Sequence, residues 1–408
     1  MAAADLLSDL ALMVWCGQNL VSTFAVAVYR RGLPQPEVPG VEPNVAVILP
    51  VKSAANLDRF LPLLRAQKYR SFRVVAAVES SDDPAFAVLS AAEREPRPSI
   101  ETVVAGPAVN AGQKVWNQLA ALERLAPDDE IVAFIDADTA PTPLWLPRLV
   151  AVIVNAKRPV ATGYRWMIPA DGRLSSACLA AANASIASLP RGVLPMPLVW
   201  GGSVAMRRTT LEAIDLKQAW RGAISDDSQI AEALRRHGLV AHAPRQGLLL
   251  TRVSCSWREF LAFGVRQYRF VYLHQPKNWA AAALTLWAPP LCIALAAPAL
   301  IAGSALAWAT LALVLVLGEA RVRLRRSLQR ALWPEVGGPD DERCWRAERW
   351  LRPVWHFLHA LSAAGAPLTR RIEWAGIRYF VRGPQDVVIE GSEDCALNGS
   401  ILRGRSPQ

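Results

Sequence analysis

The sequence lacks closely spaced cysteines. Its six cysteines are scattered over 408 residues, and none belongs to a Cys-x-x-Cys pair. Such pairs are typical of zinc cages, and densely paired cysteines are typical of small secreted domains held by disulfides. The cysteines therefore predict neither a structural metal cage nor a disulfide framework.

The sequence also lacks a nucleic-acid-binding motif, although its net charge is +10 and its pI is about 9.7. The cations gather beside apolar segments rather than along one soluble stretch. Cations in that position are typical of contacts with anionic lipid headgroups. We therefore expect a membrane partner and no nucleic acid.

No cation precedes the first apolar run, which extends from Leu10 to Tyr29. Asp5 and Asp9 come before it, and Arg30-Arg31 follows it directly. Because a cleavable signal peptide begins with cations, this order argues against one. The run is instead expected to be an uncleaved anchor with Arg30-Arg31 on the cytoplasmic side.

Apolar residues are abundant elsewhere: 52% of the chain is hydrophobic, and the mean hydropathy is +0.18. The run from Trp279 to Leu317 is about twice the ~20 residues that one membrane crossing needs. Its prolines and glycine divide it into two expected helices, 281–299 and 303–319. Four arginines follow between 321 and 326. We therefore expect a hairpin that returns to the cytoplasmic side and leaves 32–278 in the cytosol.

A third apolar stretch, 354–368, is basic at both ends. A membrane crossing should not be basic on both sides, so an interfacial or re-entrant helix is preferred over a third C-terminal crossing. The polar residues 391–408 are expected to be disordered.

The soluble region alternates short apolar runs with segments of helical spacing. Expected strands are 45–49, 73–78, 100–105 and 131–135, and expected helices are 57–66, 84–95 and 113–125. Such alternation predicts an α/β fold with a doubly wound, mostly parallel sheet. Ligands bind at the carboxyl ends of the strands in such sheets.

Asp136-Ala137-Asp138 follows the expected strand 131–135 at that edge. Two carboxylates at i and i+2 point the same way and can hold a divalent cation and the ribose or diphosphate of a nucleotide. The same short motif can also simply solvate a loop.

Other polar residues fall near the same edge. Asp82 and Asp83 follow strand 73–78, where they can bind a ligand or cap the helix that starts at Pro84. Lys114 lies near a helix N-terminus, where a cation is unfavourable unless an anion such as a diphosphate is close. A solvated lysine is the alternative.

Each of three later features has both a functional and a structural interpretation. Gly201-Gly202 lets a backbone approach a ligand or forms a plain turn. Asp226-Asp227 begins a helix, which explains one carboxylate and leaves the second as a candidate base. Arg266 and Arg269 share a helical face and can hold a diphosphate or lipid headgroups.

In their order, these motifs resemble the family 2 glycosyltransferases, and within them the ceramide glucosyltransferase-like branch. The resemblance spans 45 to 381. It rests on five features, which occur in this order: Ser81-Asp82-Asp83-Pro84-Ala85, the Asp136 motif, Gly202-Ser203, Ser225-Asp226-Asp227, and Arg266-Gln267-Tyr268-Arg269-Phe270. Lys114 and Asn117 lie between the first two, and Ile372 to Tyr379 resembles the short sequence after that branch's last membrane segment.

The resemblance implies a GT-A-like fold and an inverting transfer of a sugar from a UDP-sugar to the hydroxyl of a membrane lipid, ceramide-like or other. It implies that Asp227 is the general base, with Arg266 and Arg269 also catalytic. It places Mn²⁺ or Mg²⁺ on Asp136 and Asp138. The implied UDP-sugar contacts are Asp82, Asp83, Lys114, Asp136, Gly202, Asp226 and Gln267.

The implied organisation is an anchor over 1–31, a cytosolic GT-A domain over 32–278, a hairpin over 279–320, a basic juxtamembrane region over 321–390 and a tail over 391–408. A bacterial-type inner or cytoplasmic membrane is expected, with the catalytic domain in the cytosol.

Two departures from the family pattern matter. Phe270 stands where tryptophan is usual, which weakens an analogy to processive polysaccharide synthases. Asp138 supplies a full second carboxylate where some eukaryotic ceramide enzymes carry glycine. A polysaccharide or isoprenoid-linked oligosaccharide synthase stays an alternative, as does a non-catalytic nucleotide-binding membrane protein.

Overall fold

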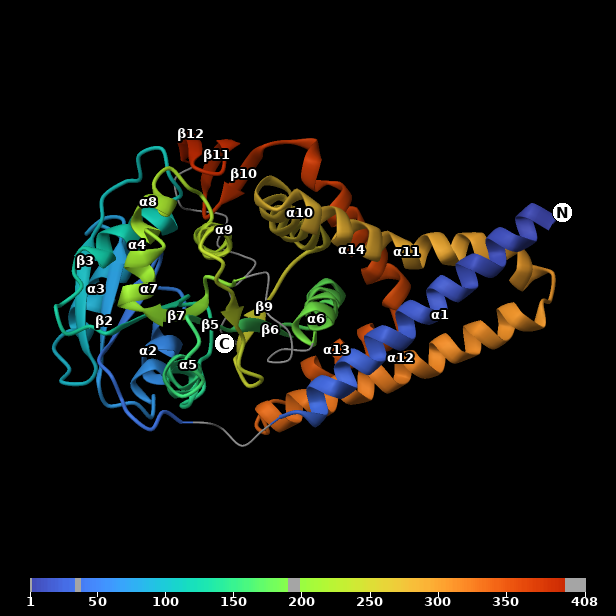
Figure 1. The fold of residues 1–408 in the computed structure, drawn as a ribbon, viewed down its shortest axis with the longest axis horizontal. Coiled ribbons are helices and arrows are strands. Elements are labelled where there is room, and N and C mark those ends of the chain that lie inside the picture. The colour runs from blue at the N-terminus through green and yellow to red at the C-terminus, as the bar shows by residue number, and fades with distance from the viewer. Residues whose placement is uncertain (1, 34–37, 190–198, 393–408) are drawn as a thin grey trace. The chain divides into compact units, whose positions relative to one another are not determined.

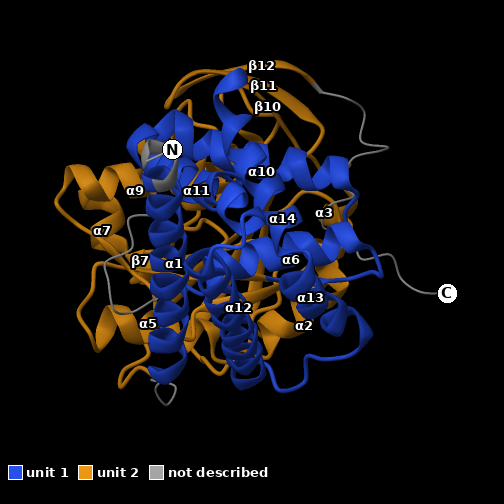
Figure 2. Ribbon diagram, turned by 90° about the vertical axis from the view of Figure 1, so that its right-hand side faces the viewer, with its two compact units in different colours: residues 1–33, 167–190, 253–368 blue, residues 34–166, 191–252, 369–408 orange. Residues whose placement is uncertain are grey.

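The computed structural model describes residues 2–33, 38–189 and 199–392 (Figure 1). The chain forms two compact units, which Figure 2 distinguishes by colour. Unit 1 comprises residues 1–33, 167–190 and 253–368, and unit 2 comprises 34–166, 191–252 and 369–408. The expected boundaries of the functional regions stay predictions.

Within the described residues, unit 2 is built on a seven-stranded sheet with the order β3-β2-β1-β4-β7-β5-β8. The strands are β1 (Val45–Pro50), β2 (Phe72–Val78), β3 (Ser99–Val104), β4 (Ile131–Ile135), β5 (Val160–Thr162), β7 (Ser203–Arg207) and β8 (Ala241–His242). The β1–β2, β2–β3, β1–β4 and β5–β8 pairs are parallel, whereas β7 runs antiparallel to β4 and β5. The expected mostly parallel α/β sheet is confirmed.

Helices cover both faces of this sheet, which explains why its strands read as unbroken apolar runs. Val45, Val47 and Leu49 of β1 face one hydrophobic cluster, whereas Ala46 and Ile48 face the other. The first cluster includes α2 (Leu57–Arg65), α3 (Pro84–Ala92) and α5 (Trp145–Val154). The second includes α4 (Gln113–Leu122), α7 (Arg208–Ala213), α8 (Leu216–Trp220) and α9 (Asp226–Arg236).

The last part of unit 2 is an antiparallel three-stranded sheet. It comprises β10 (Arg371–Trp374), β11 (Ile377–Gly383) and β12 (Asp386–Ser392). Ala375 and Gly376 both have positive φ, 53° and 79°, and connect β10 to β11. Two consecutive positive φ values are typical of the tight hairpin turn that matches strand twist.

Unit 1 is mainly helical. Its helices are α1 (Ala2–Arg31), α6 (Leu174–Ala187), α10 (Trp257–His274), α11 (Pro276–Ile301), α12 (Ala305–Leu332), α13 (Pro339–Trp350), α14 (Arg352–Ala364) and the 3₁₀ turn Ala366–Leu368. At the boundaries between units, β6 (Tyr164–Pro169) and β9 (Leu248–Val253) form a two-stranded sheet.

Three helices of the described residues are long and apolar enough to cross a membrane: Leu6–Arg31, Pro276–Ile301 and Ala305–Leu332. They coincide with the expected anchor and hairpin. Helix α14, with 13 residues, is not among them, and its interfacial placement stays a prediction.

The helix ends differ from those expected. Helix α12 continues to Leu332 rather than ending at 319, because hydropathy reports where apolar surface ends and not where backbone hydrogen bonding ends. Helix α11 runs through Pro289, Pro290 and Pro298, and prolines are tolerated inside membrane-type helices. Helix α1 begins at Ala2 rather than near Leu10.

The expected disorder of 391–408 is wrong at its start, because Gly391 and Ser392 belong to β12 and pair with β11. The remaining residues of that segment lie outside the described residues.

Candidate functional site

The candidate site lies where β4 ends, at the edge predicted from the sequence. The pairing of Ile135 with Ser203 places Gly202 of the β7 side next to Asp136. The Asp136 amide donates a hydrogen bond of 3.3 Å to the Gly202 carbonyl oxygen. An antiparallel neighbour strand therefore brings Gly202 and Asp136 together, as the expected donor site requires.

Lys114, in the first turn of α4, lies between two carboxylates. Its Nζ is 2.8 Å from Asp136 Oδ1 and 2.9 Å from Asp226 Oδ2. Burial alone would lower the pKa of Lys114, but Asp136 and Asp226 raise it above its usual value. These two ion pairs offset the unfavourable position of a cation at a helix N-terminus. Lys114 is thus a largely covered cation held by two carboxylates and not a solvated lysine.

Gln118 lies one turn further along α4 and completes the surroundings of Asp226. Its Nε2 donates to Asp226 Oδ2 at 3.1 Å, and the residue is fully buried. Sequence reasoning missed Gln118. Its i+4 spacing from Lys114 was the available signal, because residues four apart share a helical face.

The paired glycines have a steric reason. A Cβ on Gly201 would lie 2.1 Å from Asp226 Oδ2, and one on Gly202 would lie 2.7 Å from Asp136 Oδ2 and 2.2 Å from the Trp200 ring. Any side chain at either position would collide with these groups. The glycines therefore make room for the two carboxylates that hold Lys114.

Asp227 follows Asp226 in the first turn of α9. Its Oδ1 accepts hydrogen bonds from Ser225 Oγ at 2.6 Å and from the Ser228 amide at 2.7 Å. Burial and then the neighbouring Asp226 raise the pKa of Asp227. The raised pKa makes its ionised carboxylate a stronger base.

Asp138 is the carboxylate most suited to a cation. Its Oδ1 is buried and has no hydrogen-bond partner within the described residues. Burial and then Asp136 raise its pKa to about 6, whereas Arg165 and Lys114 act in the opposite direction. A divalent cation beside Asp136 and Asp138 would offset both causes, because its charge favours the ionised carboxylates.

A metal at this point would need further ligands. Among the described residues, no group of three or more His, Cys, Asp or Glu side chains is placed to hold an ion. Mg²⁺ is commonly held by one or two carboxylates together with substrate phosphates and water. Asp136 and Asp138 fit that arrangement, in which a diphosphate supplies the other oxygens.

Arg165 is a second residue that sequence reasoning missed. Its guanidinium lies 5.0 Å from the centre of the Trp200 ring. Nothing in the spacing of Arg165 or Trp200 along the chain marks them as neighbours of Asp138.

Asp83 has a structural role that the sequence allowed. Its carboxylate accepts a hydrogen bond of 2.8 Å from the Ala85 amide and caps α3, and it also accepts bonds of 3.1 and 3.2 Å from the Ser53 amide. Ser53 has a positive φ of 76° in the loop after β1, and Asp83 holds that loop. Asp82 is exposed. A nucleotide-binding role for the pair stays a prediction.

The arginine motif belongs to helix α10 of unit 1. The Arg269 guanidinium donates to the main-chain oxygens of Ala366 at 3.1 Å and Gly365 at 3.2 Å, and burial lowers its pKa. Arg266 lies over the Phe263 ring at 5.5 Å. The roles expected for Arg266, Gln267 and Arg269 at the donor stay predictions.

The C-terminal sheet contacts the helices that carry the site. Tyr379 of β11 accepts a hydrogen bond of 3.2 Å from the amide of Gln113, which precedes Lys114. The Pro384 carbonyl accepts one of 2.6 Å from Gln229 Nε2 in α9. The segment 372–379 that carried part of the family resemblance therefore supports α4 at its first turn.

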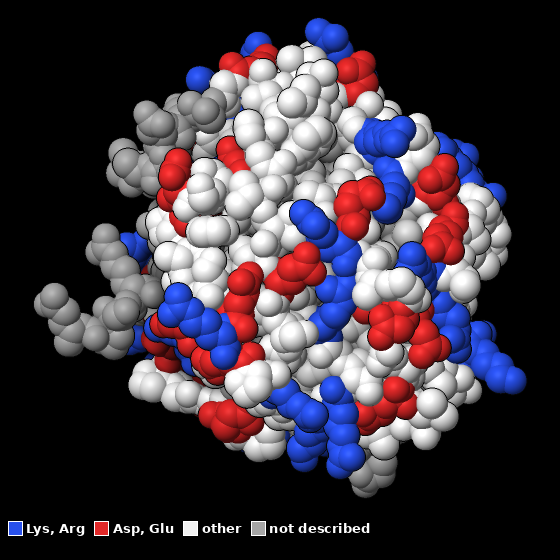
Figure 3. All heavy atoms as spheres, turned by 90° about the vertical axis from the view of Figure 1, so that its left-hand side faces the viewer, with Lys and Arg blue, Asp and Glu red and all other residues white. Residues whose placement is uncertain are grey.

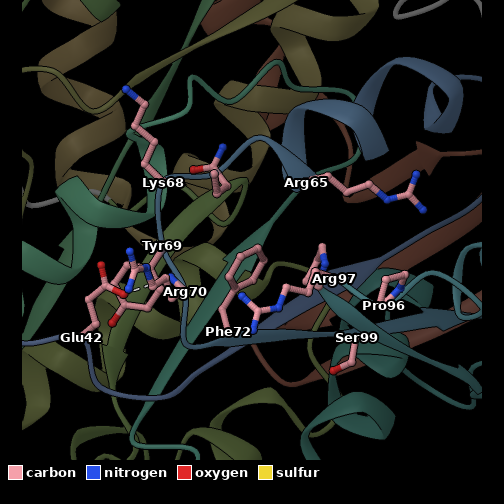
Figure 4. Close-up of a pocket in the computed structure, with 11 residues that line it drawn as sticks. Glu42, Arg65, Lys68, Tyr69, Arg70, Phe72, Pro96, Arg97 and Ser99 are labelled. Carbon is pink, nitrogen blue, oxygen red and sulfur yellow. Dashed lines mark hydrogen bonds between the residues drawn. The ribbon is translucent and has the colours of Figure 1, made fainter.

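A separate hollow of about 520 Å³ lies at the opposite edge of the sheet (Figure 4). Phe72 and Ser99, which line it, begin β2 and β3, whereas the candidate site follows the carboxyl end of β4. The hollow is therefore not part of the carboxylate cluster.

Side chains of both charges share one face of the molecule. On the face drawn in Figure 3, acidic and basic side chains alternate and form no continuous basic surface.

Two solved structures are similar to this chain, and the first of them supports the fold. A mannosyltransferase from Pyrobaculum calidifontis, solved with GDP-Man and Mn²⁺, is 20% identical, with a TM-score of 0.52 over 82% of this chain and 100% of that one. Residues 1–349 of Staphylococcus aureus TarS, solved with UDP-GlcNAc, are 12% identical, with a TM-score of 0.36 over 86% and 100% of the chains. No curated protein matches the sequence.

The family comparison covers most of the chain. The description "Glycosyl transferase family 21" matches residues 10–387, which include both the sheet and the three apolar helices. The sequence resemblance led us to expect family 2, and sugar transfer is common to both descriptions. The chain belongs to glycosyl transferase family 21.

Proposed function

We propose that this protein transfers a sugar from a UDP-sugar to the hydroxyl of a membrane lipid, ceramide-like or other, with inversion at the anomeric carbon. The family supports sugar transfer from a nucleotide sugar, and the three apolar helices support a membrane acceptor. The UDP donor and the lipid acceptor are the parts that go beyond these findings.

The observation that carries the proposal is the acidic cluster at the end of β4. Asp136 and Asp226 both pair with Lys114, and Asp138 and Asp227 are adjacent carboxyls with raised pKa values. Surplus carboxylates with raised pKa values in one site are typical of acid–base and metal chemistry. A nucleotide-binding protein without turnover has no need of Asp227.

The reaction needs a base for the acceptor hydroxyl. The carboxylate of Asp227 takes that proton while the acceptor oxygen forms a bond to the anomeric carbon and the bond to the diphosphate oxygen breaks. Ser225 and the Ser228 amide bond to Oδ1 of Asp227, which fixes the carboxylate and leaves Oδ2 for the proton. One displacement of this kind inverts the anomeric carbon.

Other residues of this chain would stabilise the negative charge of the donor's diphosphate. Asp136 and Asp138 would hold Mn²⁺ or Mg²⁺, which supplies positive charge to the leaving UDP. Lys114 adds a cation beside Asp136. The glycine pair lets the backbone approach the donor, and we assign Asp82, Asp83, Gly202, Asp226 and Gln267 to donor contacts and Arg266 and Arg269 to the diphosphate.

The orientation is part of the same proposal. The basic ends of α1 and α12 lie together, since Arg30 Nε donates to Ser327 Oγ at 2.8 Å. Cationic ends of membrane helices favour the cytoplasmic side. We therefore place the catalytic unit in the cytosol at an inner or cytoplasmic membrane.

A product assay tests the proposal. Membranes that contain the protein, and matched membranes without it, are incubated with radiolabelled UDP-sugars, Mn²⁺ and mixed lipids. Label in the organic phase only with the protein would support a lipid acceptor and identify the sugar. A growing water-soluble polymer would contradict the lipid acceptor in favour of a polysaccharide synthase, and no label in either phase would contradict transfer from UDP-sugars.

A further inference from the structure

Helices α1 and α12 enclose a basic pocket at their C-terminal ends. The pocket has a volume of about 540 Å³ and is lined by Arg30, Arg323, Arg326, Ser327, Arg330 and Ala331. All of these residues belong to unit 1, and the two helices lie side by side in Figure 1. It lies in a different unit from the carboxylate cluster.

The pocket carries an excess of positive charge. Arg323 pairs with Glu319 at 2.8 Å, and Glu319 is shared with Arg349. Arg326 pairs with Glu342, yet its Nε is buried and has no hydrogen-bond partner within the described residues.

Arg330 makes no ion pair with any described residue, and Arg30 bonds to the Ser327 hydroxyl. Four arginines line the pocket, and Glu319 and Glu342 pair with two of them. The pocket therefore keeps a net positive charge.

The helix macrodipole explains only part of this cluster. Cations are favoured in the last turn of a helix, and the effect falls off beyond it. Arg330 is in that turn of α12, which ends at Leu332, but Arg323 and Arg326 lie further back. Arg323, Ser327 and Arg330 follow the i, i+4, i+7 spacing of one helical face, which gathers the charges instead of spreading them.

Exposed apolar side chains precede the pocket-lining residues on both helices. Val21 and Phe24 of α1 are 70% and 71% exposed, and Leu315 and Val316 of α12 are 63% and 66% exposed. They precede the arginines by one to four turns in helices long enough to span a membrane. A ligand that suits both parts has an anionic phosphate head and apolar chains.

We propose that the pocket between α1 and α12 binds the phosphate of an anionic membrane phospholipid. The forked guanidinium groups match phosphate oxygens, and Arg330, which lines the pocket, has no ion pair of its own within the described residues. This site holds the protein's membrane helices at an anionic lipid surface and does not depend on the sugar transferred.

Native mass spectrometry of the full-length protein in neutral detergent tests this proposal. It measures the binding of phosphatidylglycerol, and phosphatidylcholine serves as the lipid without net charge. The pocket variant is Arg323→Gln with Arg330→Gln. The control is Arg258→Gln with Arg346→Gln, which removes the same charge from exposed arginines of unit 1 outside the pocket. Thermal unfolding without lipid checks that every variant is folded.

The pocket variant is expected to bind phosphatidylglycerol about 30-fold more weakly, with no change in the control. Equal binding by the wild type and the pocket variant would overturn the site, and an equal loss in both variants would reduce it to general charge. Competition by inorganic phosphate and glycerol 3-phosphate, each at the concentration of the lipid, tests whether the ligand is a membrane lipid or a free phosphate. If these soluble phosphates displace the lipid fully, the assignment to a membrane lipid is overturned.

Discussion

Each unit of this protein pairs a largely covered cation with carboxylates, and the two arrangements differ in their balance of charge. In unit 2, Lys114 contacts both Asp136 and Asp226. In unit 1, Arg325 pairs with the single carboxylate of Glu348, where the side chains are 4% and 0% exposed. The first arrangement has two carboxylates for one cation, whereas the second joins one arginine to one glutamate.

Unit 2 has more carboxyl groups near Lys114 than the two that contact it. Asp138 and Asp227 are each within two residues of a Lys114 partner, and both have raised pKa values. Crowded carboxylates repel one another and destabilise the folded protein, unless a proton binds to one of them or a cation lies between them. The comparison teaches that a matched buried pair belongs to the fold, whereas an unbalanced cluster indicates a place for ligand and catalysis.

Metal removal should have the largest effect, a loss of sugar transfer at the carboxylate cluster of unit 2. If Asp136 and Asp138 hold a divalent cation, chelation by EDTA should reduce sugar transfer to background, and Mn²⁺ or Mg²⁺ should restore it. The measurement is initial rate against free metal concentration. The unfolding temperature should stay unchanged in EDTA without donor, which separates metal loss from unfolding, and full transfer in chelator would remove the metal role from both residues.

Breaking the matched pair should affect stability instead. Glu348→Gln leaves Arg325 buried without its partner charge and should cost ~3–5 kcal/mol of unfolding free energy. Denaturant unfolding in detergent measures this loss. Arg325→Met together with Glu348→Leu should regain most of it, since a hydrophobic pair replaces a buried ion pair at little cost. A single variant as stable as the wild type would show that the pair is not part of what holds unit 1.

A change next to the unbalanced cluster should shift pH dependence. The Ser225 hydroxyl donates to Asp227 and lowers a pKa that burial and Asp226 raise. Ser225→Ala removes this bond, so the pKa of Asp227 should rise further. Because the ionised carboxylate is the base, the acidic limb of the rate profile should move to higher pH.

Ser256→Ala is the control for this shift. Ser256 caps α10 in unit 1 as Ser225 caps α9, so each variant should lose about 1 kcal/mol of helix capping. Only Ser225→Ala should move the acidic limb, measured from kcat against pH. An equal shift in both variants would contradict the role of Asp227.

The smallest effect is expected where the C-terminal sheet meets α4. Tyr379→Phe removes the acceptor for the Gln113 amide and should cost about 0.5–1.5 kcal/mol of stability. A modest rise in the donor KM should accompany it, because Gln113 precedes Lys114. Tyr272→Phe in α10 of unit 1 is the matched control. An unchanged unfolding temperature in Tyr379→Phe would mean that β11 gives α4 no support.

Sequence patterns predicted much of the fold because the information was local. Short apolar runs predicted four strands of the main sheet, β1 to β4, to within one residue at each end, but β5, β7 and β8 were not predicted. Hydropathy predicted the three apolar helices. Helix ends were less accurate, since α12 continues past its apolar part as far as Leu332. Backbone hydrogen bonding sets such an end, and hydropathy does not report it.

The candidate site was predictable as a set of residues but not as a geometry. Asp136 was placed at a strand end by its neighbours in the chain, and Asp83 was recognised as a possible cap. The pairing of Lys114 with Asp226 joins residues far apart in the sequence, and only the tertiary fold brings them together. The same holds for the closeness of Gly201 to Asp226 and for Arg165 near Asp138.

The most direct test of the account is turnover and UDP affinity measured together on Asp227→Asn. The account predicts that kcat falls about 10²–10⁴-fold while UDP affinity is unchanged, because this carboxylate acts on the acceptor and not on the donor. Asp215→Asn, an exposed aspartate of the same unit with a positive φ that asparagine tolerates, should match the wild type in both. Turnover near that of the wild type in Asp227→Asn, or a parallel loss of UDP binding, would contradict the assignment of Asp227 as the base.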